Sequence, residues 1–484
     1  MRKWLSVLLV VLISAGVLAA CQNIGDSGGT QNPSVSIGDG SGTPSESEYD
    51  ASNILSKFES NHYDGREFRV FCANAFNQQI FVRQVPTEDA DPADRMNSAL
   101  YNRDLKLNET FGIDIQYDLQ PNDLNMGGEL HRLVSSGDAS IDMVLGSMVY
   151  SCNPLLMEGL LLDIHAISTI DLANDWWNQN MTKYFTINDK TFFATGDITT
   201  RNPTALSLFL FNTKLFQDSQ MSYPYQDVYD GTWTYEKLFQ LCEGKNVDLN
   251  HDGYIDLEND QVGALLDSRA GLISCGGRYT ERNADGGFDM VLSTARNVDI
   301  LQMLQEYYFT KDCLLDPGYE GVSAFMSDYA YFIELAGCDL SLLRDMETDY
   351  GVVPCPKYDE QQKEYYNFAN IWITTCAAFP VTVKDAEFSG FVAEAMGALS
   401  KYTSSPEQYE VLMQNKELRD EESKKMLELS VKSATYDIGF IFNFGGCRDA
   451  VSGILGQEWD VSSQIAKIET AFQTDLEIFL EKFQ

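Results

Sequence analysis

Apolar and polar positions in residues 67–145 follow two periods in turn. Some segments alternate residue by residue, which is typical of half-buried strands, and the segments between them space apolar residues three or four apart, which is typical of helices. Gly112 follows the first helical segment as a stop signal. This order predicts an α/β fold with a largely parallel sheet flanked by helices. Strands are expected at 67–72, 113–117 and 141–145, and helices at 94–110 and 124–136.

The end of the third expected strand marks a candidate binding site. Ligands of parallel α/β sheets bind outside the carboxyl ends of the strands. Ser147, Met148 and Tyr150 directly follow the strand at 141–145, so they are candidate ligand-binding residues.

Residues 191–216 form the stretch around which the rest of the chain is organised. A short apolar run, predicted as the end of a buried strand, is interrupted by a polar group at 196–203. Residues 205–211 are then almost continuously apolar, which fits a strand buried on both faces, while periodicity alone leaves a buried helix segment open. Asn212 or Thr213 is expected to cap a following helix.

The polar interruption carries Asp197 and Arg201 where the chain passes from one buried body to another. Clefts between domains are the usual sites of small ligands. Both side chains are therefore candidates to hydrogen-bond a ligand, and they are equally suited to pair with each other.

The amino-terminal residues have the pattern of an export signal. A basic start over residues 1–3 precedes an apolar segment over 4–17 that is too short to span a bilayer. The Leu-Ala-Ala-Cys sequence ending at Cys21 resembles the lipobox of bacterial lipoproteins. That resemblance implies a signal peptide over residues 1–20 and a diacylglyceryl group on Cys21 that anchors the protein without a spanning helix. An ordinary secreted protein with a chance cysteine is the alternative.

Residues 21–50 are predicted to be a lipidated cysteine followed by a flexible tether. After Cys21 the segment has no Lys or Arg and is rich in Gly, Ser, Asn, Asp and Pro, so it buries too little apolar surface to fold. The folded body is expected to start near Asn53 or Gly65, and its length corresponds to two or three domains.

Charge and cysteine spacing exclude several classes of function. The 484-residue chain has 72 acidic and 34 basic residues and a net charge of −38, which opposes binding to nucleic acid or to anionic membranes by charge. The cysteines after Cys21 are scattered without C-x-x-C spacing, which argues against zinc-ribbon or redox motifs.

Residues 248–256 contain a pattern for metal binding. Oxygen-bearing side chains occupy loop positions 1, 3, 5 and 9, and glycine stands at position 6, as in the first part of an EF-hand-type calcium loop. Position 12 is Asn259 rather than a bidentate glutamate, and an Asx-rich turn without an ion is the alternative. The candidate ligands of a structural calcium ion are Asp248, Asn250, Asp252, Asp256 and the Tyr254 carbonyl.

Recognisable catalytic motifs are absent from the sequence. It has no G-x-S-x-G elbow, no H-E-x-x-H and no Walker loop, and its four histidines are far apart. Carboxylates are abundant enough for an Asp/Glu pair suited to glycoside hydrolysis, but the sequence singles out no pair. The protein is therefore predicted not to be an enzyme.

Four separated motifs resemble one protein family. They are IDMVL at 141–145 followed by GLLLD at 159–163, the stretch 191–216, TWTYEKL at 232–238, and YGVVPCPK at 350–357. In this order, and with the lipobox-like sequence, they resemble family 1 extracellular solute-binding proteins of bacterial ABC importers, of the carbohydrate-uptake type. The resemblance covers residues 65–484.

The resemblance implies a periplasmic-binding-protein-like fold, in which crossing strands join two α/β lobes with a ligand cleft between them. The implied amino-terminal lobe comprises residues 65–203 plus 328–376, and the implied carboxyl-terminal lobe comprises 204–327 plus 377–484. The resemblance also implies ABC permease subunits as partners, a monomer, and a lipid-anchored position on the extracellular face of the cell membrane.

Aromatic residues near the implied crossings are candidate sugar contacts. Sugars pack their C–H faces on aromatic rings and need polar partners for their hydroxyl groups. Each such ring is equally a candidate for core packing. The candidates are Trp176 and Trp177 after the first sheet, Tyr331 at the second crossing, and Asn370 and Trp372 at the third.

These features predict a substrate-binding lipoprotein that captures a small solute, with a sugar or oligosaccharide favoured, and delivers it to membrane permeases. Two alternatives stay open. One is an extracellular polysaccharide-acting enzyme of the glycoside hydrolase type, and the other is a surface glycan-binding protein that works without a transporter. No cofactor is expected apart from the candidate calcium ion.

Overall fold

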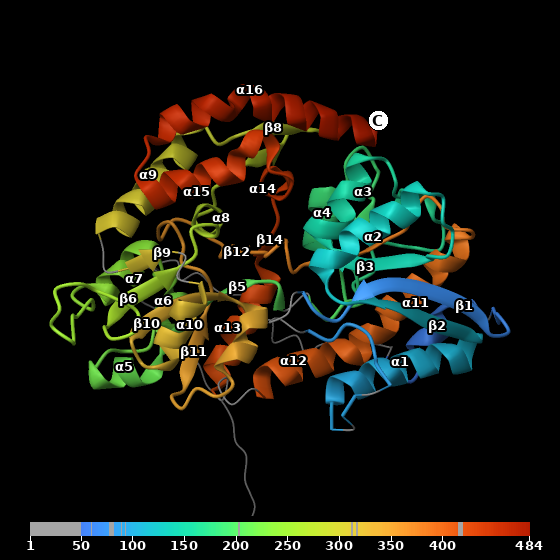
Figure 1. The fold of residues 1–484 in the computed structure, drawn as a ribbon, viewed down its shortest axis with the longest axis horizontal. Coiled ribbons are helices and arrows are strands. Elements are labelled where there is room, and N and C mark those ends of the chain that lie inside the picture. The colour runs from blue at the N-terminus through green and yellow to red at the C-terminus, as the bar shows by residue number, and fades with distance from the viewer. Residues whose placement is uncertain are drawn as a thin grey trace, which may run out of the picture. The chain divides into compact units, whose positions relative to one another are not determined.

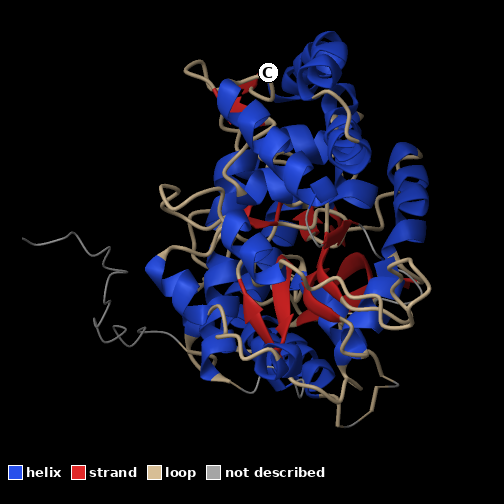
Figure 2. Cartoon of the chain, turned by 90° about the vertical axis from the view of Figure 1, so that its left-hand side faces the viewer, coloured by secondary structure: helices blue, strands red, loops and turns tan. Residues whose placement is uncertain are grey.

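Two five-stranded sheets with helices packed around them form the body of the protein (Figures 1 and 2). The structure is a computed structural model, and it describes residues 50–484 except 60, 77–81, 89, 92, 202–203, 311–312, 316–317 and 415–419. The predicted signal peptide, Cys21 and all but the last residue of the tether lie outside the described residues and stay predictions. Tyr49–Gln484 forms one compact unit.

The first sheet has the strand order β2-β1-β3-β13-β4. β1 pairs in parallel with both β2 and β3, as the strand–helix–strand pattern predicts. β13 is antiparallel to both β3 and β4. The strands are β1 (Arg66–Ala73), β2 (Ile113–Gln120), β3 (Met143–Ser147), β4 (Phe193–Ala194) and β13 (Thr375–Ala378).

Capping residues set the ends of the two helices that connect β1, β2 and β3. α1 (Arg95–Phe111) begins after Asp94, whose carboxylate accepts a hydrogen bond from a first-turn amide at 2.9 Å. It ends at Gly112, whose φ of 63° is a conformation that glycine adopts readily. α2 (Asp123–Ser135) begins in the same way after Asn122. The predicted strands and helices of this region are confirmed, with small shifts at their ends.

The second sheet has the strand order β11-β5-β10-β6-β9. Every residue of β5 is buried, which confirms a strand rather than a helix for this apolar run. Asn212 caps α5 (Thr213–Asp218), because its side chain accepts a hydrogen bond from the Leu215 amide at 3.0 Å. β10 is antiparallel to β5 and parallel to β6. The strands are β5 (Ser207–Asn212), β6 (Val262–Leu266), β9 (Cys313–Leu315), β10 (Ala330–Ala336) and β11 (Tyr350–Val353).

The strand pairing differs from the lobe boundaries expected from the sequence. The expected amino-terminal lobe includes residues 328–376, but β10 and β11 within this range pair with β5 of the second sheet. Conversely, α11 (Ala386–Tyr402) is expected with the second lobe but packs against α1, with the Phe391 and Phe111 rings 5.1 Å apart. Partner choice between distant elements depends on which surfaces are buried together, and the local period does not encode it.

The carboxyl-terminal part is helical, as predicted. In Figure 1, α16 (Val461–Leu480) runs along the upper edge, and it packs against α15 (Cys447–Gln457) and α9 (Ala295–Thr310). The other helices are α3 (Asn153–Met157), α4 (Gln179–Phe185), α6 (Tyr225–Asp230), α7 (Tyr235–Cys242), α8 (Gly271–Ser274), α10 (Gly318–Met326), α12 (Ser404–Gln414), α13 (Glu421–Lys432) and α14 (Ile438–Phe442). Two short strand pairs complete the fold, β7 (Thr280–Arg282) with β8 (Phe288–Met290) and β12 (Asn367–Phe368) with β14 (Ala434–Thr435).

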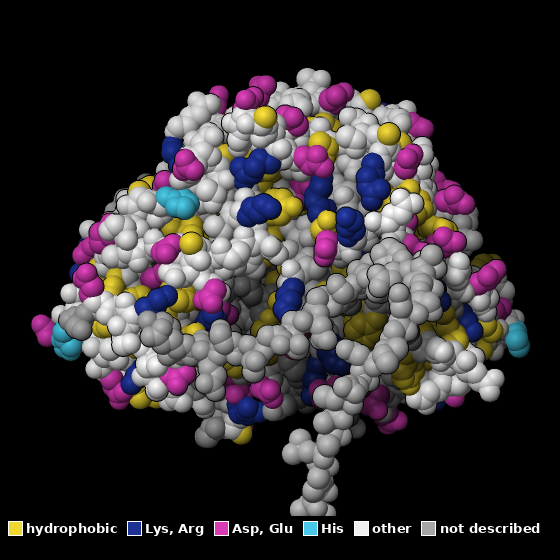
Figure 3. All heavy atoms as spheres, turned by 180° about the vertical axis from the view of Figure 1, so that it is seen from behind, with side chains coloured by type: hydrophobic (Ala, Val, Ile, Leu, Met, Phe, Trp, Pro, Cys, Tyr) yellow, Lys and Arg dark blue, Asp and Glu magenta, His cyan; other side chains and the backbone are white. Residues whose placement is uncertain are grey.

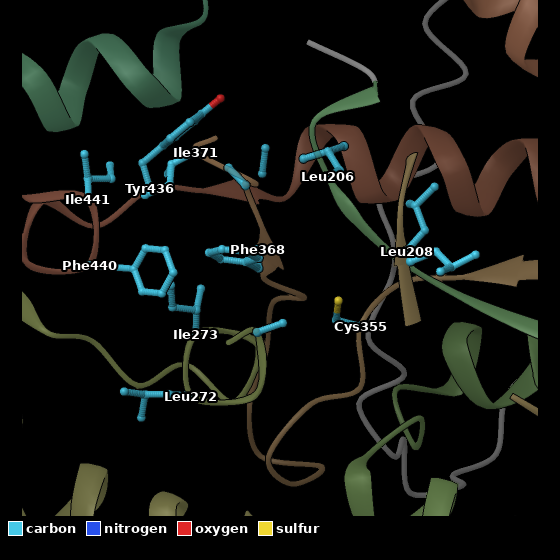
Figure 4. Packing of buried hydrophobic residues seen from close by; sticks show 14 of the residues in the cluster. Leu206, Leu208, Leu272, Ile273, Cys355, Phe368, Ile371, Tyr436, Phe440 and Ile441 are labelled. Atoms are coloured by element: carbon cyan, nitrogen blue, oxygen red, sulfur yellow. The ribbon is translucent and has the colours of Figure 1, made fainter. Parts of the chain in front are cut away.

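One large core extends from α2 and β3 through β5, β6 and β10 to the carboxyl-terminal helices. Figure 4 shows a part of it in which the rings of Phe440 and Phe368 meet edge to face, with centroids 4.9 Å apart. Trp233 is fully buried, and its Nε1 donates to the Pro354 carbonyl at 2.8 Å. Two motifs of the family resemblance, TWTYEKL and YGVVPCPK, are therefore in direct contact.

All nine described cysteines are buried. Among the helices of the described residues, none combines the length and the apolar character needed to cross a membrane.

Candidate functional site

A cavity of about 640 Å³ lies between elements of the two sheets. Phe76 follows β1, Tyr150 follows β3, and residues 267–269 follow β6. These positions are carboxyl ends of parallel strands, where α/β sheets bind their ligands. The described lining also includes Ser207, Tyr319, Glu334, Asp339, Asn370, Trp372 and Ser452.

The cavity brings together three residues predicted from the sequence, Tyr150, Asn370 and Trp372. The backbone of Trp372 is fixed on both sides: Ser147 Oγ donates to its carbonyl at 2.8 Å, and its amide donates to Asn370 Oδ1 at 3.2 Å. The rings of Tyr150 and Phe76 lie 6.0 Å apart. The cavity thus presents aromatic surface from three separate segments, against which an apolar ligand face can pack.

A polar wall of the same cavity is built from Asp267, Arg269, Glu334 and Asp339. Arg269 Nε donates to Asp267 Oδ1 at 2.8 Å, and Arg269 Nη2 donates to Asp267 Oδ2. The Asp267 amide donates to Glu334 Oε2 at 3.0 Å. A carboxyl group of β10 therefore fixes the backbone of the turn after β6 by a hydrogen bond.

Burial controls the ionisation of this wall. Glu334 is 6% exposed, and the loss of water together with the nearby Asp267 charge raises its pKa to about 8. Burial also raises the pKa of Asp339 to about 6. At neutral pH Glu334 is mostly protonated and Asp339 mostly ionised, so the wall offers both hydrogen-bond donors and acceptors.

Glu334→Gln is expected to change how stability depends on pH. Between the ordinary glutamate pKa of 4.5 and the folded value of about 8, the folded protein keeps a proton that the unfolded chain has lost, so stability falls as pH rises. Glutamine has no proton to lose, so the variant should melt roughly 2–4 °C above the wild type at pH 9, and this gain should disappear at pH 4. Melting curves of both proteins measure it, and an equal difference at both pH values would contradict the raised pKa.

Trp176, Trp177 and Asp197 line a second, smaller cavity of about 170 Å³. Trp177 Nε1 donates to Glu394 Oε2 at 2.8 Å. The Trp176 ring lies so close to Gly397 that a Cβ atom added to this glycine would be only 2.9 Å from the ring. Both indole rings therefore pack on α11. Burial raises the pKa of Asp197 to about 6.

Met148, Tyr331 and Arg201 are buried in contacts with the protein itself. The Tyr331 hydroxyl shares a hydrogen bond with Ser219 Oγ at 2.7 Å. Arg201 is fully buried and forms its ion pair with Asp123 rather than with Asp197. These contacts assign the three side chains to packing and argue against their prediction as ligand contacts.

None of the four residues of the polar wall, Asp267, Arg269, Glu334 and Asp339, was found from the sequence. The first two follow the apolar run of β6 directly, so the rule that selected the residues after β3 applies to them as well. Glu334 lies inside the buried strand β10, and an isolated acid in an apolar run carries no signal of its role.

The calcium-like loop is folded by its own hydrogen bonds. Asp248 accepts loop amides, the shortest at 2.6 Å, and the buried Asp260 accepts the amides of Leu249 and Asp256 at 2.8 and 3.0 Å. In the part of the chain that the structure describes, no group of three or more His, Cys, Asp or Glu side chains is arranged to hold a metal. This geometry fits the Asx-rich turn, and calcium binding stays a prediction.

The two interpretations of the loop predict different melting behaviour. If the predicted ligands bind calcium, the ion should raise the melting temperature, because a ligand that binds only the folded state stabilises it. Asp252→Ala removes one predicted ligand at the exposed side of the loop and should abolish the rise. Identical melting temperatures of the wild type in calcium and in chelator would assign the loop to a turn that needs no ion.

The fold has counterparts among solved structures of binding proteins. An ABC substrate-binding protein from Listeria monocytogenes, in complex with cycloalternan, matches with a TM-score of 0.52 and 13% identity over 86% of this chain and 100% of its own. A cyclo/maltodextrin-binding protein complexed with maltotetraose matches with a TM-score of 0.56 and 13% identity, over 85% and 97%. The GacH receptor of Streptomyces glaucescens, studied unliganded and with acarbose, matches with a TM-score of 0.54 and 11% identity, over 85% and 99%.

These likenesses confirm the predicted α/β, periplasmic-binding-protein-like fold. No family model matches the chain, and no curated protein matches it in sequence. At such low identity the likeness establishes the fold alone.

Proposed function

We propose that this protein is a solute receptor that binds a carbohydrate, in particular an oligosaccharide, in the 640 Å³ cavity. The observation that carries the proposal is the combination of three aromatic residues, Phe76, Tyr150 and Trp372, with the polar wall in one cavity at the strand ends. A sugar needs both surfaces, because its C–H faces pack on rings while its hydroxyl groups need donors and acceptors.

The solved structures with this fold support the same ligand class. They are binding proteins or receptors, and they were studied with cycloalternan, maltotetraose and acarbose. A receptor that captures its ligand without breaking a bond is consistent with the absence of recognisable catalytic motifs in the sequence.

In this proposal the receptor is a monomer held at the extracellular face of the membrane through lipidated Cys21. Closure of the two lobes around the ligand would create the surface that ABC permease subunits recognise. Acidic side chains are spread over the face shown in Figure 3, and the net charge of −38 favours solubility and keeps the body off anionic headgroups.

A thermal-shift screen of the body from Tyr49 onward tests the proposal. A ligand present well above its Kd raises the melting temperature of the protein that binds it. A shift with one member of a maltotetraose, cellotetraose and xylotetraose panel, with the sugar recovered intact, would support the receptor. No shift with any sugar would contradict the carbohydrate assignment and direct the search to peptides or polyols.

A polysaccharide-acting enzyme is the second candidate, because three carboxyl groups line the cavity and one of them has a strongly raised pKa. Glycoside hydrolysis uses a carboxyl pair of this kind, with one member protonated at working pH. Release of reducing ends by the wild type, and its loss in Glu334→Gln, would favour the enzyme.

A surface glycan-binding protein without a transporter would bind sugar but have no permease genes beside its own.

A further inference from the structure

Two guanidinium groups flank the Trp372 ring. Arg269, from the turn after β6, lies 5.0 Å from the ring centroid, and Arg448, from α15, lies 5.1 Å from it. Phe440 meets the same ring edge to face at 5.8 Å. Ser147, the last residue of β3, fixes the Trp372 backbone through its carbonyl, and Arg269, which follows β6 of the second sheet, lies against the ring. Groups from both sheets therefore restrain this residue, one at its backbone and one at its side chain.

The two arginines differ in how firmly they are held. Arg269 makes a two-point contact with the Asp267 carboxylate, and the Asp267 amide is fixed in turn by Glu334. Arg448 approaches its neighbour Asp449 to 3.8 Å, and its Nη1 donates to the Phe440 carbonyl at 3.4 Å, so its described contacts are single and long rather than a two-point pairing with one carboxylate. Arg269 also lines the cavity. Arg448 is not among the described lining residues, and it contacts the Trp372 ring, which is. A guanidinium fixed at two points is a planar, immobile neighbour for an aromatic ring.

We propose that Arg269 is a positioning residue of the sugar site, which holds the Trp372 indole in the plane that receives the ligand. The inference rests on the proposed function, because it requires that the ligand packs on Trp372. The attraction between the guanidinium and the ring face restrains the side-chain torsions of the tryptophan. The ligand then does not have to order the ring when it binds, and this preorganisation appears as affinity.

A double-mutant cycle separates this role from a direct contact between Arg269 and the ligand. Affinity for the strongest binder of the sugar panel is measured for Arg269→Gln in the wild type and in Trp372→Leu. We expect Arg269→Gln to weaken binding about tenfold in the wild type and less than about twofold in Trp372→Leu, because its effect passes through the ring. Equal losses in both backgrounds would overturn the inference while leaving the proposed function standing.

Three further variants test the geometry. Arg448→Gln removes the other guanidinium and is expected to weaken binding less than Arg269→Gln does, and an equal loss would overturn the assignment to Arg269.

Arg269→Lys keeps the charge but loses the planar two-point contact, so it should resemble Arg269→Gln, and full affinity would contradict the proposal. Arg269→Gln leaves the Asp267 carboxylate without its arginine, and the added change Asp267→Asn removes that charge. If the double variant still binds weakly and melts at the wild-type temperature, misfolding is excluded as the cause of the lost affinity. If the wild type binds no sugar at all, the proposed function itself fails, and this inference fails with it.

Discussion

Replacing Arg201 by methionine is expected to lower the free energy of unfolding by about 3–5 kcal/mol, because it leaves one charge of a buried ion pair without its partner. The side chains of Arg201 and Asp123 are both fully buried. Arg201 also donates to the Ala73 carbonyl at 3.3 Å and to Thr375 Oγ1 at 3.4 Å. One side chain thus ties together β1, α2 and β13 just before the chain enters the second sheet.

Urea denaturation followed by circular dichroism measures this loss. Removing both charges, with Arg201→Met and Asp123→Leu, is expected to recover most of it, since a buried pair replaced by apolar groups leaves no uncompensated charge. Arg132→Met is the matched control: its guanidinium pairs with Glu129 at the surface, and the unfolding midpoint should not move. A loss below about 1 kcal/mol for Arg201→Met would show that water or a neighbouring group compensates the remaining charge.

The local architecture was predictable because its signals are local. The helix α1 carries its start at Asp94 and its stop at Gly112, and a single residue type at each position satisfies the helix end. The apolar run of β5 likewise predicted a strand buried on both faces. Each of these signals depends on a few neighbouring residues, so a single sequence contains it in full.

The lobe boundaries were not predictable in the same way, because they depend on contacts between distant residues. Arg282 of β7 donates to the carbonyls of Lys183 and Thr186, both at 2.8 Å, and so satisfies the carboxyl end of α4 almost 100 positions earlier in the chain. Nothing in the sequence around Arg282 marks this partner. The pairing of β10 with β5 likewise joins residues that are far apart in the sequence, and no local pattern marks it.

The site was predicted in part, and its failures have a common cause. Trp372 was predicted as an aromatic residue and Tyr150 from its place after β3, whereas Phe76 was not predicted. A sequence does not show whether an indole N–H is already satisfied inside the protein, as that of Trp177 is by Glu394. Trp372 differs, because its backbone is fixed while its half-buried ring lines the cavity. The neighbours of each ring, rather than its identity, separate packing from ligand binding.

Trp372→Ala is therefore expected to weaken binding of the best sugar ligand by about 30-fold or more, the effect of losing roughly 2 kcal/mol at an aromatic residue central to a binding site. The protein should stay folded, because the ring is only half-buried and the hydrogen bonds to Ser147 and Asn370 are made by the Trp372 backbone, which alanine keeps. Titration calorimetry gives the affinity, and the far-ultraviolet circular dichroism spectrum checks the fold.

Trp459→Ala is the matched control, since this tryptophan follows α15 at the surface and does not line either described cavity. It should bind the sugar as the wild type does. Unchanged affinity in Trp372→Ala would remove Trp372 from the site and would contradict the proposal that the sugar packs on this ring. The same loss in both variants would indicate a general effect of removing an indole. A loss confined to Trp372→Ala places the ligand on a ring that groups from both sheets hold in position.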